Sequence, residues 1–197
     1  MLENFKFHWI NESEIKQTED EIMIYAPAGS EYFNNPIPEN GKLPEPIKTA
    51  PIYYTEIEGD FVIRAKVSHE FEYDFDAASV MVIVNPDCWG KAAFELSDFK
   101  EHVVVSAVTN GVTDDANGVN IEGNEVWFQV ARVGNCFAMH YSTDGENFYM
   151  MRLFTLPAEE SIKVALEAQS PCGKGGKRYY RNVSIEKKTL KDLRAGK

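Results

Sequence analysis

The sequence is poor in cysteine, in basic residues and in long apolar runs, and each shortage excludes a class of protein. Its three cysteines, Cys88, Cys136 and Cys172, are an odd number without C-x-x-C spacing, so they predict free thiols rather than a disulfide framework or a zinc site. No stretch approaches the roughly 18 apolar residues of a membrane span, and the N-terminus lacks the pattern of a signal peptide. We therefore expect a cytoplasmic protein without a membrane partner.

The charge is strongly one-sided. The 197 residues include 31 acidic and 20 basic residues, for a net charge of -11. A surface of this sign disfavours nucleic acid as a partner and favours a neutral or cationic ligand. The hydrophobic content of 44% is ordinary for a globular protein, and the length suits one all-β domain over residues 1–197.

The main pattern of the sequence is the alternation of apolar and polar residues with a period of two. In Phe61-Val62-Ile63-Arg64-Ala65-Lys66-Val67 the odd positions are apolar while Arg64 and Lys66 point the other way, as in a half-buried strand. About ten to thirteen strands are expected in all. The clearest are residues 21–26, 51–55, 61–67, 77–84, 91–96, 102–109, 126–132, 137–142, 148–154, 162–170 and 179–186. Tight turns between them, and no helical period, favour a two-sheet antiparallel β-sandwich over βαβ units.

Three segments stand apart from this pattern. Residues 34–51 carry five prolines and predict a long irregular loop whose role stays open. Residues 113–118, Thr-Asp-Asp-Ala-Asn-Gly, predict an Asx-rich turn rather than a calcium loop. The basic tail, residues 187–197, predicts at most a short frayed helix.

Motifs of known chemistry are lacking. The four histidines are scattered without metal-ligand spacing, so no metal and no cofactor is expected. The best acidic cluster, Glu95, Asp98 and Glu101, has a spacing of three, which strand alternation does not place on one face. Remote carboxylates can still converge, so a glycoside hydrolase stays open.

The strand that follows Trp89 is more informative. Alternation places Lys91, Ala93 and Glu95 on one face and Ala92, Phe94 and Leu96 on the other. Charged groups flanking a small residue beside an aromatic are typical of a sugar site. The same pattern also fits an exposed Lys–Glu pair on a solvated sheet with Trp89 in the core.

Ordered short blocks between residues 5 and 186 carry a family resemblance. They are Tyr73-Asp74-Phe75-Asp76-Ala77-Ala78, Trp89-x-Lys91-x-x-x-Glu95, Val105-Ser106-Ala107-Val108-Thr109, Asp114, Arg132, Asp144-Gly145, Arg152 and Ala168-x-Ser170-Pro171. The chain resembles the domain-of-unknown-function family 1349, or regulation-of-enolase-like family, of the concanavalin A-like lectin/glucanase superfamily. The resemblance implies a jelly-roll sandwich with a concave sheet and, by kinship with carbohydrate-binding modules, sugar binding.

Three hypotheses follow. The first is a non-catalytic protein that binds a saccharide or small polar ligand on the concave face. Its candidate residues, including those implied by the resemblance, are Asp76, Trp89, Lys91, Glu95, Ser106, Thr109, Asp114, Arg132 and Arg152. Lys91 and Glu95 would bind hydroxyls while Asp76 and Arg132 shape the floor. The second is a glycoside-acting enzyme that uses Glu95 with Asp76 or Asp114. The third is a protein-interaction module using the Pro-rich loop or a sheet edge. The oligomeric state is left open.

Overall fold

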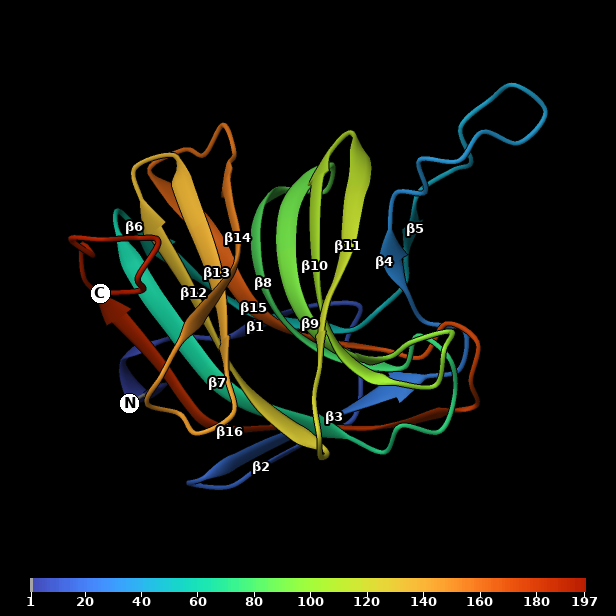
Figure 1. Ribbon diagram of the computed structural model, residues 1–197, viewed down its shortest axis with the longest axis horizontal. Helices are drawn as coiled ribbons and strands as arrows, with labels where there is room; N and C mark the ends of the chain where they lie inside the picture. Colours follow the sequence, from blue (N-terminus) through green and yellow to red (C-terminus); the bar gives the residue numbers. More distant parts are fainter. Residues whose placement is uncertain (1) are drawn as a thin grey trace.

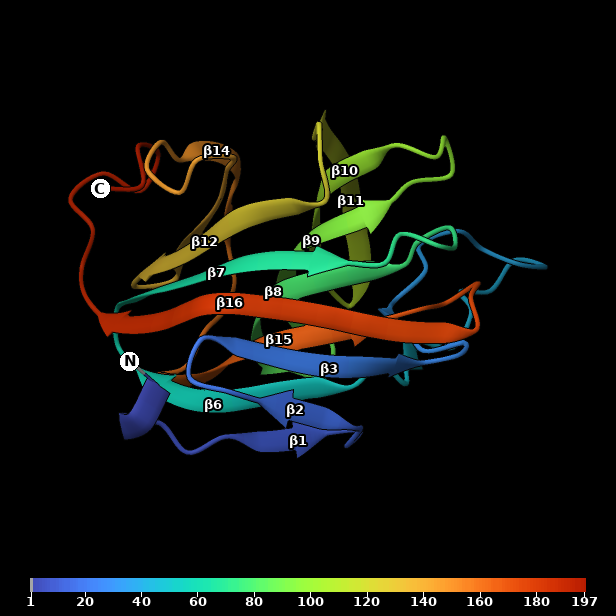
Figure 2. The same cartoon turned by 90° about the horizontal axis from the view of Figure 1, so that it is seen from below.

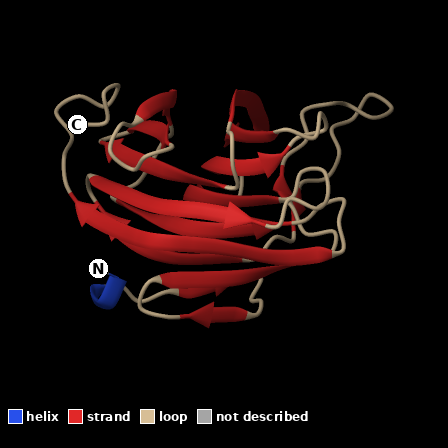
Figure 3. Ribbon diagram, turned by 60° about the horizontal axis from the view of Figure 1, so that its bottom comes forward, coloured by secondary structure: helices blue, strands red, loops and turns tan. Residues whose placement is uncertain are grey.

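The computed structural model describes residues 2–197, and these form two packed antiparallel sheets (Figures 1 and 3). The first, sheet A, has seven strands in the order β1 (His8–Ile10), β6 (Ile52–Glu58), β15 (Ser161–Gln169), β8 (Ala77–Asn85), β9 (Cys88–Leu96), β10 (His102–Asn110) and β11 (Val112–Asn120). The all-β two-sheet sandwich predicted from the sequence is confirmed.

The second sheet, sheet B, also has seven strands. Their order is β14 (Tyr149–Thr155), β13 (Cys136–Ser142), β12 (Glu125–Val133), β7 (Phe61–His69), β16 (Gly175–Lys187), β3 (Glu21–Pro27) and β2 (Ile15–Gln17). Figure 2 shows β12, β7, β16 and β3 side by side in one layer. A short 3-10 helix, η1 (Leu2–Asn4), precedes the first strand.

The main core fills the space between the two sheets. Alternate residues of β8, β9 and β15 point into it, among them Val80, Phe94 and Leu166, and they meet Ile63 and Phe128 of sheet B. Because successive side chains of a strand point to opposite faces, the residues between them lie on the outer face of sheet A. That outer face carries the charged residues of β9.

A small hairpin lies on the outer side of sheet A. Its strands are β4 (Tyr32–Phe33) and β5 (Ile47–Lys48). Figure 1 shows it beyond the curved strands β8 to β10, on the side away from β12 to β14, with the Pro-rich segment between its strands projecting outward. Asn34 ties the hairpin to sheet A, because its side chain donates to Gly111 O at 2.8 Å and its main chain donates to Thr113 Oγ1 at 3.1 Å.

One local prediction is wrong. Residues 113–118 belong to strand β11 rather than to a turn, because they pair with β10 across a ladder that a bulge interrupts. The tail beyond Lys187, for which at most a short frayed helix was predicted, forms turns without a helix and crosses the outer side of sheet B. Leu190 there packs on Val62 and Ala131, and Gln129 Nε2 donates to Gly196 O at 3.2 Å. The short strands β1, β2, β4 and β5 lack an alternation long enough to predict them.

Candidate functional site

The candidate site is the outer face of sheet A around Lys91. The pairing register sets Lys91 beside Met81 and Ala107, and sets Glu95 beside Ala77 and Val103. The predicted alternation along β9 is therefore confirmed. The prediction of a solvated face is wrong, because Lys91 is only 4% and Glu95 only 9% exposed.

Lys91 is the centre of this face, and its ammonium group is held by residues distant in the sequence. Its Nζ donates to Gln169 Oε1 at 2.7 Å and to Tyr32 O at 3.1 Å. It also lies 3.8 Å from Glu167 Oε1, the one ion pair recorded for it among the described residues. Lys91 therefore ties β15 and the β4–β5 hairpin to β9, and its ion-pair partner is Glu167 rather than Glu95.

Glu167 and Ser79 present buried polar atoms without partners. Both side chains are fully buried, and the register places the two residues side by side on β15 and β8. Within the described part of the chain, neither carboxylate oxygen of Glu167 nor Ser79 Oγ has a hydrogen-bond partner. Leaving such groups unpaired is costly, so these atoms are expected to receive hydrogen bonds from water or from a ligand.

The floor between these polar groups is built from small side chains. Ala93 separates Lys91 from Glu95 on β9, while Ala77 and Ser79 stand beside it on β8. On the other side of β9, Ala107 is paired with Lys91. A floor of small residues lets the longer charged side chains converge above it.

Three carboxyl groups near Lys91 have raised pKa values. Burial raises the pKa of Glu95 to about 8, although the nearby Lys91 ammonium acts in the opposite direction. Partial desolvation by neighbouring groups also raises the pKa values of Glu31 and of Asp115, whose residue is otherwise exposed, again against the attraction of Lys91. Glu95 is therefore expected to be protonated near neutral pH, when its carboxyl group can donate a hydrogen bond as well as accept one.

Trp89 closes one end of this face. It is fully buried beside Tyr32 of the hairpin, with ring centroids 5.6 Å apart in a T-shaped arrangement. Its Nε1 has no hydrogen-bond partner in the described structure. Thr109, the neighbour of Trp89 across the sheet, shares a 2.7 Å hydrogen bond with Thr113. Trp89 and Thr109 thus lie on the predicted face.

Asp76 does not shape the polar floor. Its carboxylate lies 3.1 Å from Arg178 Nη2, and both side chains are almost completely buried. Arg178 also donates to Ala77 O and Gln169 O, so it ties β16 of sheet B to β8 and β15 of sheet A. Asp76 therefore serves the connection between the two sheets.

Ser106, Asp114 and Arg152 lie on the opposite side of sheet A from Lys91. Ser106 pairs with Ala92, which points into the core, and Asp114 pairs with Val108. Arg152 of β14 approaches this side, 4.0 Å from Asp114 Oδ2. The Asp114 side chain is 89% exposed. These three residues do not join the Lys91 cluster.

Arg132 is also distant from that cluster. It lies on β12 of sheet B, and its guanidinium donates to Gly134 O at 2.7 Å, to Glu160 O at 3.0 Å and to Glu159 O at 2.5 Å. It holds two loops at one end of the sandwich. The prediction that it shapes the sugar floor is wrong, because its strand belongs to the other sheet.

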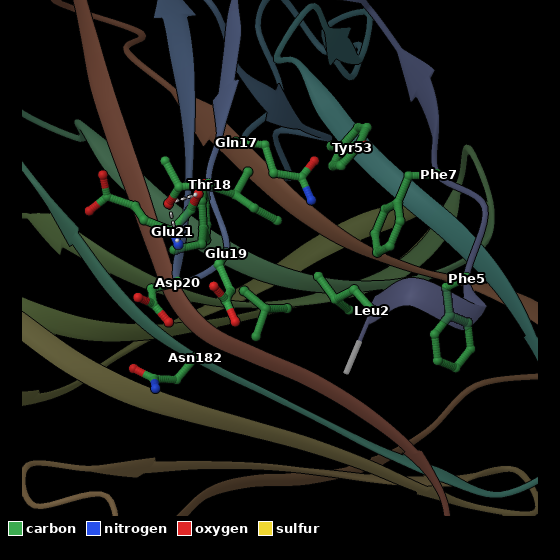
Figure 4. Close-up of a pocket in the computed structure, with 13 residues that line it drawn as sticks. Leu2, Phe5, Phe7, Gln17, Thr18, Glu19, Asp20, Glu21, Tyr53 and Asn182 are labelled. Carbon is green, nitrogen blue, oxygen red and sulfur yellow. Dashed lines mark hydrogen bonds between the residues drawn. The ribbon is translucent and has the colours of Figure 1, made fainter.

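A cavity of about 550 Å³ lies elsewhere in the molecule. It is bounded by η1, the β2–β3 turn and β16, and contains none of the predicted site residues. Figure 4 shows Phe5 and Phe7 on one side and the turn from Thr18 to Glu21 on the other. Its polar groups lie in an acidic turn, so it lacks the converging buried donors and acceptors of the outer face of sheet A.

Metal-binding clusters and membrane-spanning helices are both absent from the described residues. Groups of three or more His, Cys, Asp or Glu side chains arranged to hold a metal ion do not occur there. The described helical residues include no segment long and apolar enough to cross a membrane.

The family described as "Protein of unknown function (DUF1349)" matches residues 9–188. The chain belongs to this family. A relative of this DUF1349 chain is Regulation of enolase protein 1 from Saccharomyces cerevisiae, 29% identical over 114 residues. That match covers 56% of each protein, so the chain spans just over half the length of this curated relative.

Solved structures resemble the DUF1349 sandwich at low sequence identity. A functionally unknown protein from Saccharomyces cerevisiae has a TM-score of 0.84 and 21% identity, with 93% of this chain and 97% of that one covered. A bifunctional GH43-CE protein from Bacteroides eggerthii has a TM-score of 0.71 and 12% identity, covering 93% of this chain and 24% of that one. The carbohydrate-binding module CBM66 from Bacillus subtilis has a TM-score of 0.57 and 10% identity, covering 90% and 94%. These likenesses show a shared fold.

Sequence reasoning missed Glu167, Gln169, Ser79, Glu31 and Asp115. A signal was present for the two residues of β15, because Lys163, Glu167 and Gln169 are polar at alternate positions opposite Val164, Leu166 and Ala168. Gln169 also stands inside the block Ala168-x-Ser170-Pro171 that carries the DUF1349 resemblance. The signal was not used because alternation along β15 does not reveal which strand lies beside it.

Proposed function

We propose that this protein binds a saccharide or a saccharide-like polar ligand on the outer face of sheet A, without converting it. The observation that carries the proposal is the unpartnered Glu167 carboxylate, fully buried beside Ser79 and 3.8 Å from Lys91. A buried carboxylate without hydrogen bonds reduces stability. Hydroxyl groups of a ligand would supply the missing hydrogen-bond donors, and ligand binding would then explain why a carboxylate is present at this buried position.

The exposure of the charged groups supports an approach from the β11 side. Glu167 is fully buried, Lys91 is 4% and Glu95 9% exposed, and Asp115 on the edge strand β11 is exposed. A ligand entering past Asp115 would meet Glu95 and Lys91 first, and it would reach the fully buried Glu167 once these covering side chains moved aside. Kinship of fold with the module CBM66 and with GH43 proteins supports a saccharide among the possible polar ligands.

A glycoside-acting enzyme is the second candidate, favoured by the Glu95 carboxyl group. Its pKa of about 8 suits a general acid near neutral pH. The partner acids first considered do not serve this role, because Asp76 is occupied by Arg178 and Asp114 lies on the opposite side of the sheet. Asp115 lies near Glu95 and is the remaining candidate for the second acid, so the assay for reducing ends below separates turnover from binding.

The interaction-module candidate rests on the projecting loop. Ile37 is 68% and Leu43 53% exposed between the strands of the hairpin. Isolated apolar side chains are common on protein surfaces, so this observation carries less weight than the buried polar cluster.

The test is a thermal-shift screen against mono-, di- and oligosaccharides at about 10 mM. A ligand with a dissociation constant of about 1 mM would add roughly 1.4 kcal/mol, or about 3 to 5 °C for a chain of this length. The variant Ser79→Ala removes an unpartnered hydroxyl and should fold at least as stably as the wild type, yet it should lose most of the shift. Asp114→Asn is the matched control and should keep it.

The same sugars should then be scored for release of reducing ends. Binding without release supports the proposal, and release that Glu95→Gln abolishes favours the enzyme. A cooperative melt that no sugar shifts would contradict both.

A further inference from the structure

On the outer face of sheet A, the cationic groups already have hydrogen-bond or ion-pair partners, whereas several acceptor atoms have no hydrogen-bond donor. Two hydrogen bonds of the Lys91 ammonium go to Tyr32 O and Gln169 Oε1, and its remaining side faces Glu167. An ammonium group has three donors, so Lys91 has little capacity left for a ligand anion.

The neighbouring cations are also committed to acidic partners. Lys163 Nζ lies 3.6 Å from Glu56 and 5.4 Å from the ring centroid of Tyr54. Lys48 of the hairpin pairs with Asp87 at 2.5 Å. The structure thus offers an incoming phosphate or carboxylate no uncommitted cation among these groups.

Acidic groups, in contrast, surround the centre of the site. Glu31, Glu95 and Asp115 all lie close enough for Lys91 to lower their pKa values against burial, and Glu167 lies beside the same ammonium. One lysine is therefore shared among four carboxyl groups, of which Glu95 is expected to be neutral near pH 7. Bringing another negative charge beside the ionised ones is unfavourable.

The unpartnered atoms indicate which ligand group fits. Both oxygens of Glu167 require donors, Trp89 Nε1 requires an acceptor, and Ser79 Oγ can act as either. A hydroxyl group both donates and accepts. Two neighbouring hydroxyls can donate to the two oxygens of one carboxylate, as paired N–H groups do.

We infer that this site selects a neutral polyhydroxylated ligand, with adjacent hydroxyls on the Glu167 carboxylate, and rejects the uronate and phosphate forms of the same sugar. The inference rests on the proposed function, because it specifies the chemistry of the ligand at the proposed face.

The test compares sugars that differ in one charged group. Isothermal titration would use glucose, galactose, xylose, arabinose and fructose, together with glucuronate, galacturonate, glucose 6-phosphate and fructose 6-phosphate. The expected result is that at least one neutral sugar binds and that its anionic form binds at least about tenfold more weakly.

Variants then connect the discrimination to Glu167. Glu167→Gln, which is nearly isosteric, should weaken the neutral sugar about tenfold and reduce the preference over its uronate, whereas Asp114→Asn should change neither. If Glu167→Gln does not fold, Ser79→Ala, with an expected weakening of severalfold, replaces it.

The outcomes separate the two claims. A uronate or phosphate that binds as tightly as the best neutral sugar, or tighter, overturns this inference and leaves the proposed saccharide site standing. Binding of a neutral sugar that neither Glu167→Gln nor Ser79→Ala weakens also overturns it. If no sugar binds, the proposed function fails and the inference fails with it.

Discussion

Replacing Glu95 by glutamine tests whether this buried carboxyl group is neutral. Burial raises its pKa from 4.5 to about 8, so the folded protein keeps a proton that the unfolded chain releases. The free energy of unfolding should therefore be unaffected below about pH 4.5 and should fall as the pH rises from there to about 8. Glutamine resembles the protonated acid and does not ionise, so Glu95→Gln removes this loss.

The magnitude follows from the two pKa values. Between pH 4.5 and pH 7 the unfolded chain is stabilised because its Glu95 releases the proton. At about 1.4 kcal/mol per pH unit, this lowers the free energy of unfolding by roughly 3 kcal/mol at pH 7. Above pH 8 the whole difference between the folded and unfolded pKa values of Glu95 counts, and the free energy of unfolding is lower by about 5 kcal/mol. Glu95→Gln should thus be more stable than the wild type by about these amounts at pH 7 and pH 9, and nearly equal to it at pH 4.

The measurement is urea unfolding of both proteins at the three pH values, with equal slopes required for comparison. The control is Glu122→Gln at an exposed position, where a difference within about 0.5 kcal/mol is expected. A Glu95→Gln variant that is less stable than the wild type at pH 7 would refute the reasoning. Glu95 would then be an ionised partner of Lys91.

Further predictions concern the other charged groups and can be checked by the same urea titrations. Lys91→Met should destabilise the fold by about 3 to 5 kcal/mol, because it leaves Glu167 buried without a counter-charge. The double variant Lys91→Met with Glu167→Gln should recover most of this loss. If it recovers none, Lys91 and Glu167 are not paired. Asp76→Asn should also cost about 3 to 5 kcal/mol, since Arg178 is completely buried, and an unchanged midpoint would count against a structural role. Asp114→Asn should change stability by less than about 0.5 kcal/mol, because its ion pair with Arg152 is exposed. A larger loss would show that this ion pair contributes to the stability of the fold.

Alternation along each strand predicted more than the fold class. It placed Lys91, Ala93 and Glu95 on one face of β9 and Phe94 on the other, because successive side chains of any strand point to opposite faces. The turn at Asn110-Gly111 likewise follows from local chemistry, since Gly111 adopts a φ of 86°. Such features depend only on residues close together in the chain.

Local pattern along the chain therefore predicted a sandwich of alternating strands and a polar stripe on β9. The position of β15 next to β8, which brings Glu167 and Gln169 to Lys91, follows only from the folded structure. The folded structure also sets Tyr32 of the β4–β5 hairpin against Lys91 and Trp89, and the polar stripe is buried rather than solvated. Periodicity specifies which side chains share a face, whereas their partners and their burial depend on long-range strand order and on the segments that cover the face.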